Sequence, residues 1–448
     1  MNLEEALQHL PTDASEAEVV DKFVQAFLEA LGFSDLERIR EFPAGGRNGV
    51  DVAVRKNLDG DIFTENKNNP FLYVEAKARS KNLGDEKHRH YCDTVEQLKR
   101  YLHAPVSHSV AWGIITNSAH IQLFRKHGKI VHPVTPCLST GDNIQKIVDD
   151  FKKIISMPKR TLTIAVYNNK GGVGKTTTTL NMAATLIREG KKVLIVDFDP
   201  SQSDLGDALN LSPLDGELLE VLKSKNSDAK AAISTYKFEH PSLKSPWCID
   251  IIRADSRMAN DVDENDLRQH LKLHALKRSL ESVSNEYDYI LIDTPPNWRI
   301  FSQQAIYAAD VVLIPARHDN LHSLQNAGTA IAKYIPEIQR KRQELEGEAG
   351  PIALPIFMNN AFKETSHQKQ LMHNAIAKII KETRKEMNGF DLLPYFYPRY
   401  KASNKDLTMI SIPYMAYISR ADFMHIPAAF GFKVAREQYQ QIAKEYFL

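Results

Sequence analysis

A glycine-rich stretch offers the clearest chemistry in this sequence, and it lies between an apolar run (162–167) and a helix-like segment (178–188). It reads Asn169, Lys170, Gly171, Gly172, Val173, Gly174, Lys175, Thr176 and Thr177. A glycine turn between a strand and a helix directs backbone N–H groups and a helix N-terminus at phosphate. Lys175 is placed to reach terminal phosphates and the Thr176 hydroxyl to ligate Mg²⁺. We expect a phosphate-binding loop; the alternative is a solvated glycine turn.

The loop has a second lysine, Lys170, and Asn169 stands where such loops usually begin with glycine. The pattern Lys-Gly-Gly-x-Gly-Lys-Thr-Thr resembles that of the ParA/MinD family of partition and positioning ATPases. The resemblance implies ATP and Mg²⁺ as cofactors, and a homodimer in which two subunits enclose two nucleotides. Lys170 would then reach the partner's phosphates, where its charge would support phosphoryl transfer. The alternative is a solvent-facing loop lysine.

Acidic residues follow two further strand-like runs, 192–196 and 287–292. By the family resemblance, Asp293 holds Mg²⁺, Asp199 positions the attacking water and Asp197 supports the metal shell. An aspartate at a strand end also has a simpler use, as the cap of the next helix. The resemblance further suggests that Asn359, after a later strand, contacts adenine.

The N-terminal part carries a second set of charged residues on two predicted strands, 50–55 and 71–78. The first strand holds Asp51, and the second holds Glu75 and Lys77. Residues two apart on a strand share a face, so Glu75 and Lys77 should point together. Two carboxylates beside one ammonium form a candidate Mg²⁺ site, at which the lysine would orient a water or steady charge.

Gln97 and Tyr101 follow on a predicted helix, 93–102, and the predicted order is helix, three strands, helix, strand. Residues 14–128 resemble the PD-(D/E)XK nuclease domain at the N-terminus of type I restriction endonuclease R subunits. The resemblance implies catalytic roles for Asp51, Glu75, Lys77, Gln97 and Tyr101, and Glu16 is added as a candidate from the preceding helix, 15–32. The alternative is a nuclease fold that only binds DNA.

Two weaker patterns also bear on binding. His88, His90 and Cys92 have alternate spacing, but the charged segment around them favours a solvated loop over a metal site. Arg399 and Lys401 resemble a Pro-Arg stretch of chromosomal partition ATPases, and with Lys405 they are candidates for non-specific DNA contact that weakens with salt. A solvated surface remains the alternative for these three residues.

Length and composition limit the class of protein. At 448 residues more than one domain is expected. Lys and Arg number 57 against 56 Asp and Glu, so the chain has no overall basic field for nucleic acid. Three scattered cysteines indicate a reducing, cytoplasmic setting, and we expect neither a signal peptide nor a membrane span.

These patterns predict an α/β protein in three parts. A restriction-endonuclease-like αβββαβ domain would occupy residues 1–140, a helical connector 141–159, and a doubly wound, mostly parallel P-loop NTPase domain 160–448. Within the last part we expect a helix at 264–283 and a packed C-terminal helix. The packed face of that helix would carry Val434, Tyr439, Ile442 and Tyr446.

The leading hypothesis is a ParA-like ATPase (AAA domain) that dimerises on ATP and controls or positions a fused Mg²⁺-dependent DNA endonuclease. Such a fusion would suit defence against foreign DNA or a mobile element, and a partner protein could stimulate the ATPase. The alternative is a DNA partition or positioning ATPase whose N-terminal domain only binds DNA.

Overall fold

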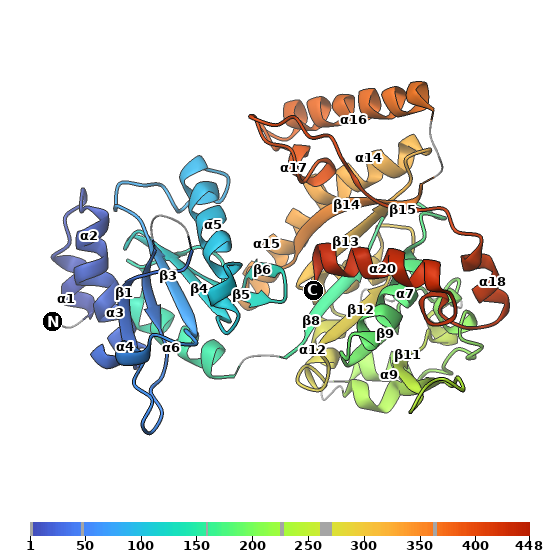
Figure 1. Ribbon diagram of the computed structural model, residues 1–448, viewed down its shortest axis with the longest axis horizontal. Coiled ribbons are helices and arrows are strands. Elements are labelled where there is room, and N and C mark those ends of the chain that lie inside the picture. Colours follow the sequence, from blue (N-terminus) through green and yellow to red (C-terminus); the bar gives the residue numbers. More distant parts are fainter. Residues whose placement is uncertain (1–2, 46–48, 158–159, 225–227, 260–270, 362–364) are drawn as a thin grey trace. The chain divides into compact units, whose positions relative to one another are not determined.

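The computed structural model describes residues 3–45, 49–157, 160–224, 228–259, 271–361 and 365–448. The chain divides into two compact units (Figure 1). The first comprises residues 1–158 with 343–349 and 447, and the second comprises 159–342, 350–446 and 448.

The N-terminal unit is built on one mixed sheet with the order β1-β2-β3-β4-β5-β6, and β7 pairs with β5. β3 and β4 run parallel and are joined through helix α5, whereas the other neighbours are antiparallel. The predicted order of helix, three strands, helix and strand is therefore present. The strands are β1 (Arg38–Phe42), β2 (Val50–Val54), β3 (Leu72–Ala76), β4 (Trp112–Thr116), β5 (His120–His127), β6 (Ile130–Pro133) and β7 (Leu138–Ser139).

Helices pack on both faces of this sheet. Alternate residues such as Val52 and Val74 contact the N-terminal helices and α6, while Ala53 and Tyr73 face α5. The segment that we expected as a connector, 141–159, thus contributes its helix α6 to the N-terminal core. The helical segments are α1 (Leu3–Gln8), α2 (Glu16–Glu18), η1 (Val19–Val24), α3 (Gln25–Ala30), η2 (Asp35–Glu37), α4 (Phe63–Asn66), α5 (Arg89–Leu102), η3 (Pro105–Ser107) and α6 (Ile144–Ser156).

The predicted helix at 15–32 begins at Ser15, which forms a reciprocal capping box with Glu18. Residues 19–24 form a π-helical segment between two α-helical ones. Such segments are rare and often occur near functional sites. Here the segment follows directly on the short helix that carries Glu16.

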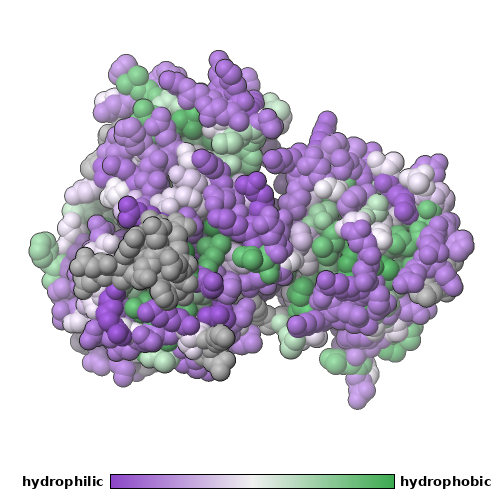
Figure 2. Space-filling model, turned by 180° about the vertical axis from the view of Figure 1, so that it is seen from behind, coloured by the Kyte–Doolittle hydropathy of each residue, from purple (hydrophilic) through white to green (hydrophobic). Residues whose placement is uncertain are grey.

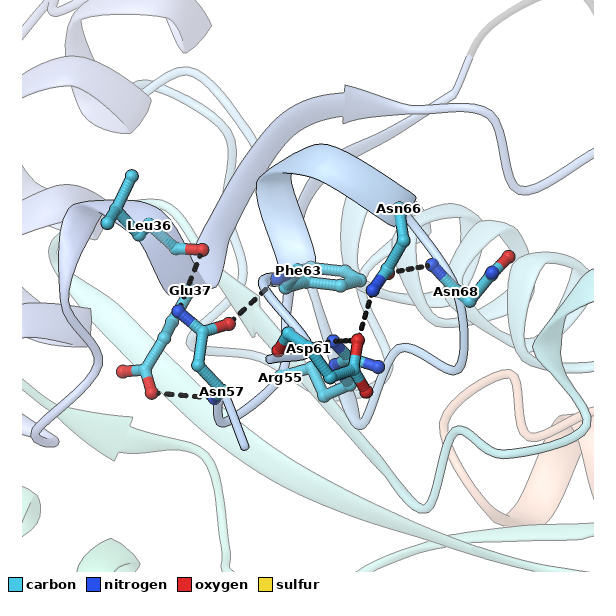
Figure 3. A network of polar contacts seen from close by, with 8 residues as sticks. All are labelled: Leu36, Glu37, Arg55, Asn57, Asp61, Phe63, Asn66 and Asn68. Atoms are coloured by element: carbon cyan, nitrogen blue, oxygen red, sulfur yellow. Dashed lines mark hydrogen bonds and ion pairs between the residues drawn. The ribbon is translucent and has the colours of Figure 1, made fainter. Parts of the chain in front are cut away.

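The loop between β2 and β3 is polar in sequence but well ordered by side-chain contacts (Figure 3). Asn57 accepts a hydrogen bond from Phe63 N at 2.8 Å and donates its own backbone N–H to Glu37 Oε1 at 2.9 Å. Arg55 pairs with Asp61 at 2.7 Å. These contacts fix the loop to the edge of the sheet through η2.

The second unit contains a sheet of eight described strands in the order β10-β11-β9-β12-β8-β13-β14-β15. All neighbours are parallel except β10 and β11. The predicted mostly parallel sheet is therefore observed, and the antiparallel edge strand β10 was not anticipated. The strands are β8 (Leu162–Val166), β9 (Val193–Asp197), β10 (Ile233–Phe238), β11 (Trp247–Ile252), β12 (Tyr289–Asp293), β13 (Val311–Ala316), β14 (Ile352–Ala361) and β15 (Ile410–Pro413).

Helices cover both faces of the second sheet. α7 packs against β8, β9, β11 and β12, and α20 packs against α7. The opposite face meets α12, α13, α14 and α15 in two apolar clusters. The helical segments are α7 (Lys175–Arg188), α8 (Asp204–Asp207), α9 (Glu217–Lys223), η4 (Ala229–Ala232), α10 (Ser256–Ala259), α12 (Ala275–Glu281), α13 (Ile300–Ala308), α14 (Leu321–Thr329), η5 (Ala330–Tyr334), α15 (Ile335–Glu346), α16 (Ser366–Glu386), α17 (Leu393–Phe396), α18 (Tyr417–Phe423), α19 (Ala428–Gly431) and α20 (Lys433–Tyr446).

Two helix predictions in this unit need correction. The helix expected at 264–283 is observed only as α12, seven residues long, and 264–270 lie outside the described residues. In α20, Tyr439, Ile442 and Tyr446 are buried as expected, but Val434 is 43% exposed. Val434 is the second residue of the helix, beyond the stretch that packs on α7.

The surface of both units is mostly polar in the view of Figure 2, with small separate apolar patches. Within the parts of the chain that the structure describes, no helix is long and apolar enough to cross a membrane.

Candidate functional site

The glycine-rich loop joins the end of β8 to the start of α7, as expected. Gly172 and Gly174 have φ of +74° and +85°, in the left-handed region that favours glycine. Gly174 is the N-cap of α7. A Cβ built on Gly171 or Gly172 would meet nothing within 4 Å, so the backbone there is open to a ligand. The geometry suits an anion at the first turn of α7.

Three asparagine side chains in or beside the loop donate hydrogen bonds to backbone carbonyls. Asn359 Nδ2 donates to Val173 O at 2.9 Å, and Asn326 Nδ2 donates to Asn169 O at 2.7 Å. Asn168 is fully buried and donates to Pro315 O at 2.8 Å. Asn359 thus supports the loop directly, and its adenine contact stays a prediction. Neither Asn168 nor Asn326 was predicted from the sequence. For Asn168, the sequence offers only the position of a polar side chain directly after a predicted buried strand.

Asp197 and Asp293 end neighbouring parallel strands at the same register position, and each is 1% exposed. Burial raises the pKa of Asp293 to about 7, although the Thr176 hydroxyl and the Lys175 charge oppose this. Burial and the charge of Asp293 raise the pKa of Asp197 well above its usual range. Two adjacent buried carboxylates of this kind form a place for a cation.

Lys175 and Asp199 complete this group. Lys175 is 7% exposed, and this burial lowers its pKa. The negative charges of Asp293, Asp199 and Asp204 act in the opposite direction and raise the pKa. Asp199 accepts a hydrogen bond from Ser201 N at 3.2 Å, and burial raises its pKa. Asp204 was not predicted; it lies at the start of α8, in an irregular segment with no motif to mark it.

Lys170 and Thr177 of the loop make few contacts in the described part of the chain. Lys170 is half-buried and makes no ion pair among the described residues. Thr177 uses its carbonyl to accept a hydrogen bond from Asn181 Nδ2 at 2.8 Å, within α7.

In the N-terminal unit, Asp51, Glu75 and Lys77 come together where the neighbouring strands β2 and β3 reach one end of the sheet. Asp51 on β2 accepts a hydrogen bond from Ala76 N, on the neighbouring strand β3, at 2.6 Å. Lys77 Nζ donates to Glu75 Oε1 at 2.5 Å and lies 3.6 Å from Glu16 Oε2. The predicted common direction of Glu75 and Lys77 is therefore observed.

The electrostatics of this group also favour a cation. Burial raises the pKa of Asp51 to about 6, and burial together with the charge of Asp51 raises that of Glu75 to about 7. For Lys77, burial acts to lower the pKa, but the charges of Glu75, Glu16 and Asp51 raise it. Glu75 Oε2 is buried and has no hydrogen-bond partner among the described residues. An orphaned carboxylate oxygen of this kind fits a metal ligand.

Gln97 and Tyr101 lie on α5, where Gln97 Nε2 donates to Tyr101 OH at 3.3 Å. Among the described contacts neither residue touches Asp51, Glu75 or Lys77. The structure thus pairs these two predicted residues with each other and leaves the acidic group separate from them.

His88, His90 and Cys92 do not form a metal site. His90 accepts a hydrogen bond from Asn82 N, and Cys92 Sγ donates to Glu86 O. The described residues include no group of three or more His, Cys, Asp or Glu side chains arranged for a metal. Mg²⁺ often binds through only one or two carboxylates together with substrate phosphates and water, so the pair of Asp51 and Glu75 still suits it.

The basic residues of the C-terminal segment are exposed. Arg399 forms an ion pair with Glu445 at 3.1 Å, and Lys401 and Lys405 lie on the surface. Part of the charge predicted to contact DNA is therefore compensated within the second unit.

Comparisons with known proteins concern the second unit. Residues 161–346 match the family described as AAA domain. The sporulation initiation inhibitor protein Soj of Bacillus subtilis is 36% identical over 179 residues, which are 38% of this chain and 66% of that protein. The chromosome-partitioning ATPase Soj of Treponema pallidum is 36% identical over 153 residues, 34% of this chain and 56% of that protein. The chain thus spans about half to two thirds of these relatives.

Among solved structures, the septum site-determining protein MinD of Pyrococcus horikoshii, complexed with Mg-ADP, is similar. It is 20% identical and aligns over 64% of this chain and 95% of that chain, with a TM-score of 0.43.

Proposed function

We propose that residues 161–346 form a P-loop ATPase domain of the ParA/MinD family, and that the chain is an ATP-binding and ATP-hydrolysing enzyme. ATP would close a homodimer, and that dimer would control or position Mg²⁺-dependent DNA cleavage by the N-terminal unit. The observation that carries the nuclease part is Glu75 Oε2, buried and unpartnered beside Asp51 and Lys77.

In the second unit, the open backbone at Gly171 and Gly172 and the start of α7 would hold the phosphates. Lys175 would neutralise their charge. Thr176, Asp197 and Asp293 would hold Mg²⁺, which when bound supplies charge neutralisation at phosphate and lowers the pKa of a coordinated water.

Two further residues would complete hydrolysis and dimerisation. Asp199 lies beside Lys175 and would orient the attacking water. Lys170 would reach the phosphates held by the other subunit, since within its own chain it makes no described ion pair.

In the N-terminal unit, Asp51 and Glu75 would hold Mg²⁺. Lys77 is held by Glu75 and Glu16 and would orient the attacking water or steady charge at the scissile phosphate. Gln97 and Tyr101 on α5 would contact the nucleic acid away from these carboxylates. Arg399, Lys401 and Lys405 are candidates for non-specific DNA contact from the second unit.

The test is cleavage of plasmid DNA with Mg²⁺ by the wild type and by Lys77→Ala, each with no nucleotide, with ADP and with ATP. Cutting by the wild type alone is the expected result, and its dependence on ATP measures control by the second unit. Equal cutting by Lys77→Ala would contradict the nuclease assignment. Cutting that persists unchanged in Lys175→Ala, at an ATP concentration that saturates the wild type but not this weaker-binding variant, would contradict control by ATP.

A second candidate is a DNA partition or positioning ATPase whose N-terminal unit only binds DNA. The relative of Treponema pallidum is named as a chromosome-partitioning ATPase, which favours it. DNA binding stimulated by ATP, without cutting under any of the nucleotide conditions, would support this candidate over the first.

A further inference from the structure

One stretch of the N-terminal unit has an unusual charge composition. Residues 97–141 contain no Asp or Glu, although 56 of the 448 residues of the chain are acidic. The same stretch holds five Lys or Arg and five His. Such a sign imbalance within one folded unit indicates a surface that meets an anion.

The structure gathers four of these residues at one end of the sheet; we refer to Lys99, Arg100, His103 and Lys126 as the basic cluster. The last turn of α5 lies tightly on the start of β4, since a Cβ on Gly113 would come within 2.8 Å of Leu98. Lys99 and Arg100 belong to that turn, and His103 is its C-cap.

Lys126 reaches the same place from β5. Its backbone N–H donates to Ala111 O, just before β4, and its Nζ donates to Ser107 O, each at 2.8 Å. Ser107 belongs to η3, which follows directly on the end of α5. The cluster therefore combines residues from two elements that the fold holds together.

Like charges dominate this end of the unit. Burial lowers the pKa of His103, and the charges of Lys126, Lys99 and Lys129 lower it further. Burial also lowers the pKa values of Lys99 and Lys126. The charge of Glu96 opposes this effect at Lys99. A bound anion would relieve this repulsion.

The strand register relates the cluster to the carboxylate group. Glu75 pairs with Ile115, and Lys126 N donates to Ala111 O, four residues earlier in the chain. Four residues of strand span about 13 Å, and β3 and β5 are two strand spacings, about 10 Å, apart. The separation is therefore about 16 Å, or about five phosphates of one DNA strand at about 3.4 Å each along the helix axis.

We infer that the basic cluster binds the phosphate backbone of nucleic acid, independently of sequence, about five phosphates from the group that bears Glu75. The choice of nucleic acid over an acidic protein rests on the proposed nuclease function. The cluster would hold nucleic acid even when the carboxylates lack a metal and cleavage does not occur. Substitutions in the cluster should therefore weaken binding, whereas substitutions of the carboxylates should abolish cleavage only.

The test is fluorescence anisotropy of a labelled duplex of about 30 base pairs, in EDTA and without nucleotide, over a series of KCl concentrations. The wild type is compared with the triple variant Lys99→Ala, Arg100→Ala and Lys126→Ala. Each lost phosphate contact should reduce the slope of log K against log salt by about 0.9, so the expected reduction is about 2–3. An unchanged slope would overturn the inference.

A matched control removes three exposed lysines from α6 of the same unit, by Lys146→Ala, Lys152→Ala and Lys153→Ala. This variant should keep the wild-type slope, and an equal reduction would overturn the assignment to the cluster. If the triple variant fails to fold, Arg100→Glu alone, at an exposed position, should still weaken binding and reduce the slope; wild-type binding would contradict the inference.

Two further arms separate this inference from the proposed function. Glu75→Ala should keep the wild-type slope, because metal-free binding does not use the carboxylates; a reduced slope would count against the cluster. Normal cutting by Lys77→Ala would remove the nuclease proposal without changing the slope result. Displacement of the duplex by poly-L-glutamate as readily as by unlabelled DNA would indicate an acidic protein partner and overturn the choice of nucleic acid.

Discussion

Both units place two carboxylates and a lysine near the ends of neighbouring strands, but they do so differently. In the N-terminal unit Lys77 is paired directly with Glu75, and Glu75 Oε2 has no hydrogen-bond partner in the part of the chain that the structure describes. In the second unit Asp197 and Asp293 end adjacent parallel strands, and Asp293 bonds to Thr176 of the loop. The lysine of the first site forms a direct ion pair, whereas the second site places two carboxylates at the same register position of adjacent strands, where Lys175 acts on Asp293 through its charge.

This difference bears on how each site would respond to its ligands. A site in which one carboxylate already pairs with a lysine keeps part of its charge balanced until substrate phosphate arrives with a metal. A site with adjacent buried acids gains more from Mg²⁺ and nucleotide, because both bring the missing charges. The second unit is therefore the better candidate for a switch driven by binding.

The largest expected effect is a loss of DNA cleavage without a loss of ATP hydrolysis, which would assign the two activities to the two sites. Glu75→Gln keeps the shape of the side chain but removes a proposed metal ligand, so we expect DNA cleavage to fall at least about 100-fold. ATP hydrolysis should stay at the wild-type rate. Both are measured on one preparation, with Glu65→Gln, at an exposed position on α4, as the control. Retained cleavage would show that the N-terminal carboxylates do not hold a metal.

The next effect compares two lysines of one loop. Lys175→Ala should weaken ATP binding about 10- to 100-fold, because a charge-assisted phosphate contact is lost. Lys170→Ala should bind ATP as the wild type does but fail to dimerise and hydrolyse. Calorimetry and light scattering with ATP and with ADP measure these outcomes. Normal dimerisation and hydrolysis by Lys170→Ala would refute the role across the interface.

The order of elements was accessible from sequence because short apolar runs alternate with helical patterns, and the glycine-rich loop fixes the start of α7. The edge strand β10 was missed because its half-exposed residues lack a clear pattern. Val434 has a spacing that suits the packed face of α20, but its exposure depends on where the helix meets α7, which lies far away in sequence.

In the candidate sites, too, contacts between residues close in sequence were predictable, whereas contacts between distant residues were not. Glu75 and Lys77 are two residues apart, so the period of a strand predicts their meeting. Asp51 is 24 residues from Glu75, and only strand pairing brings Asp51 to Ala76. The contacts that Asn326 and Asn168 make below the loop join residues separated by more than 140 positions, and no local pattern reports them.

A smaller effect tests whether the buried carboxylate of Asp293 destabilises the fold when neither Mg²⁺ nor nucleotide is bound. The native state of Asp293 holds its proton up to about pH 7, whereas the unfolded state loses it near pH 4. Its contribution to stability therefore falls as pH rises from about 4 to 7. Without Mg²⁺ or nucleotide, Asp293→Asn should be more stable than the wild type by about 1–3 kcal/mol at pH 8 and by less at pH 5.

Urea unfolding in EDTA measures this difference. Asp207→Asn, at an exposed position on α8, removes the same charge and should change stability little. Added Mg-ATP should stabilise the wild type but not Asp293→Asn. A variant that is less stable than the wild type at pH 8 would show that Asp293 serves the fold rather than a bound cation.

The smallest effect concerns Glu37, a carboxylate that the fold uses structurally, in contrast to the two sites. Burial acts to raise its pKa, but hydrogen bonds from Asn57, Ser34 and Lys56 lower it to about 2. Its contribution to stability is therefore present above about pH 4 and is lost as pH falls towards 2. Glu37→Gln should cost about 1–2 kcal/mol at pH 7 and progressively less below pH 4.

Thermal or urea unfolding of the full chain between pH 2.5 and 7 would measure this change, with Glu65→Gln as the control in the same loop region. The opposite pH trends of Glu37 and Asp293 follow from their surroundings. Glu37 is surrounded by donors that satisfy its charge, whereas Asp293 lies beside other carboxylates. If both variants shifted stability in the same direction over this range, the distinction between structural and ligand-binding carboxylates in this protein would fail.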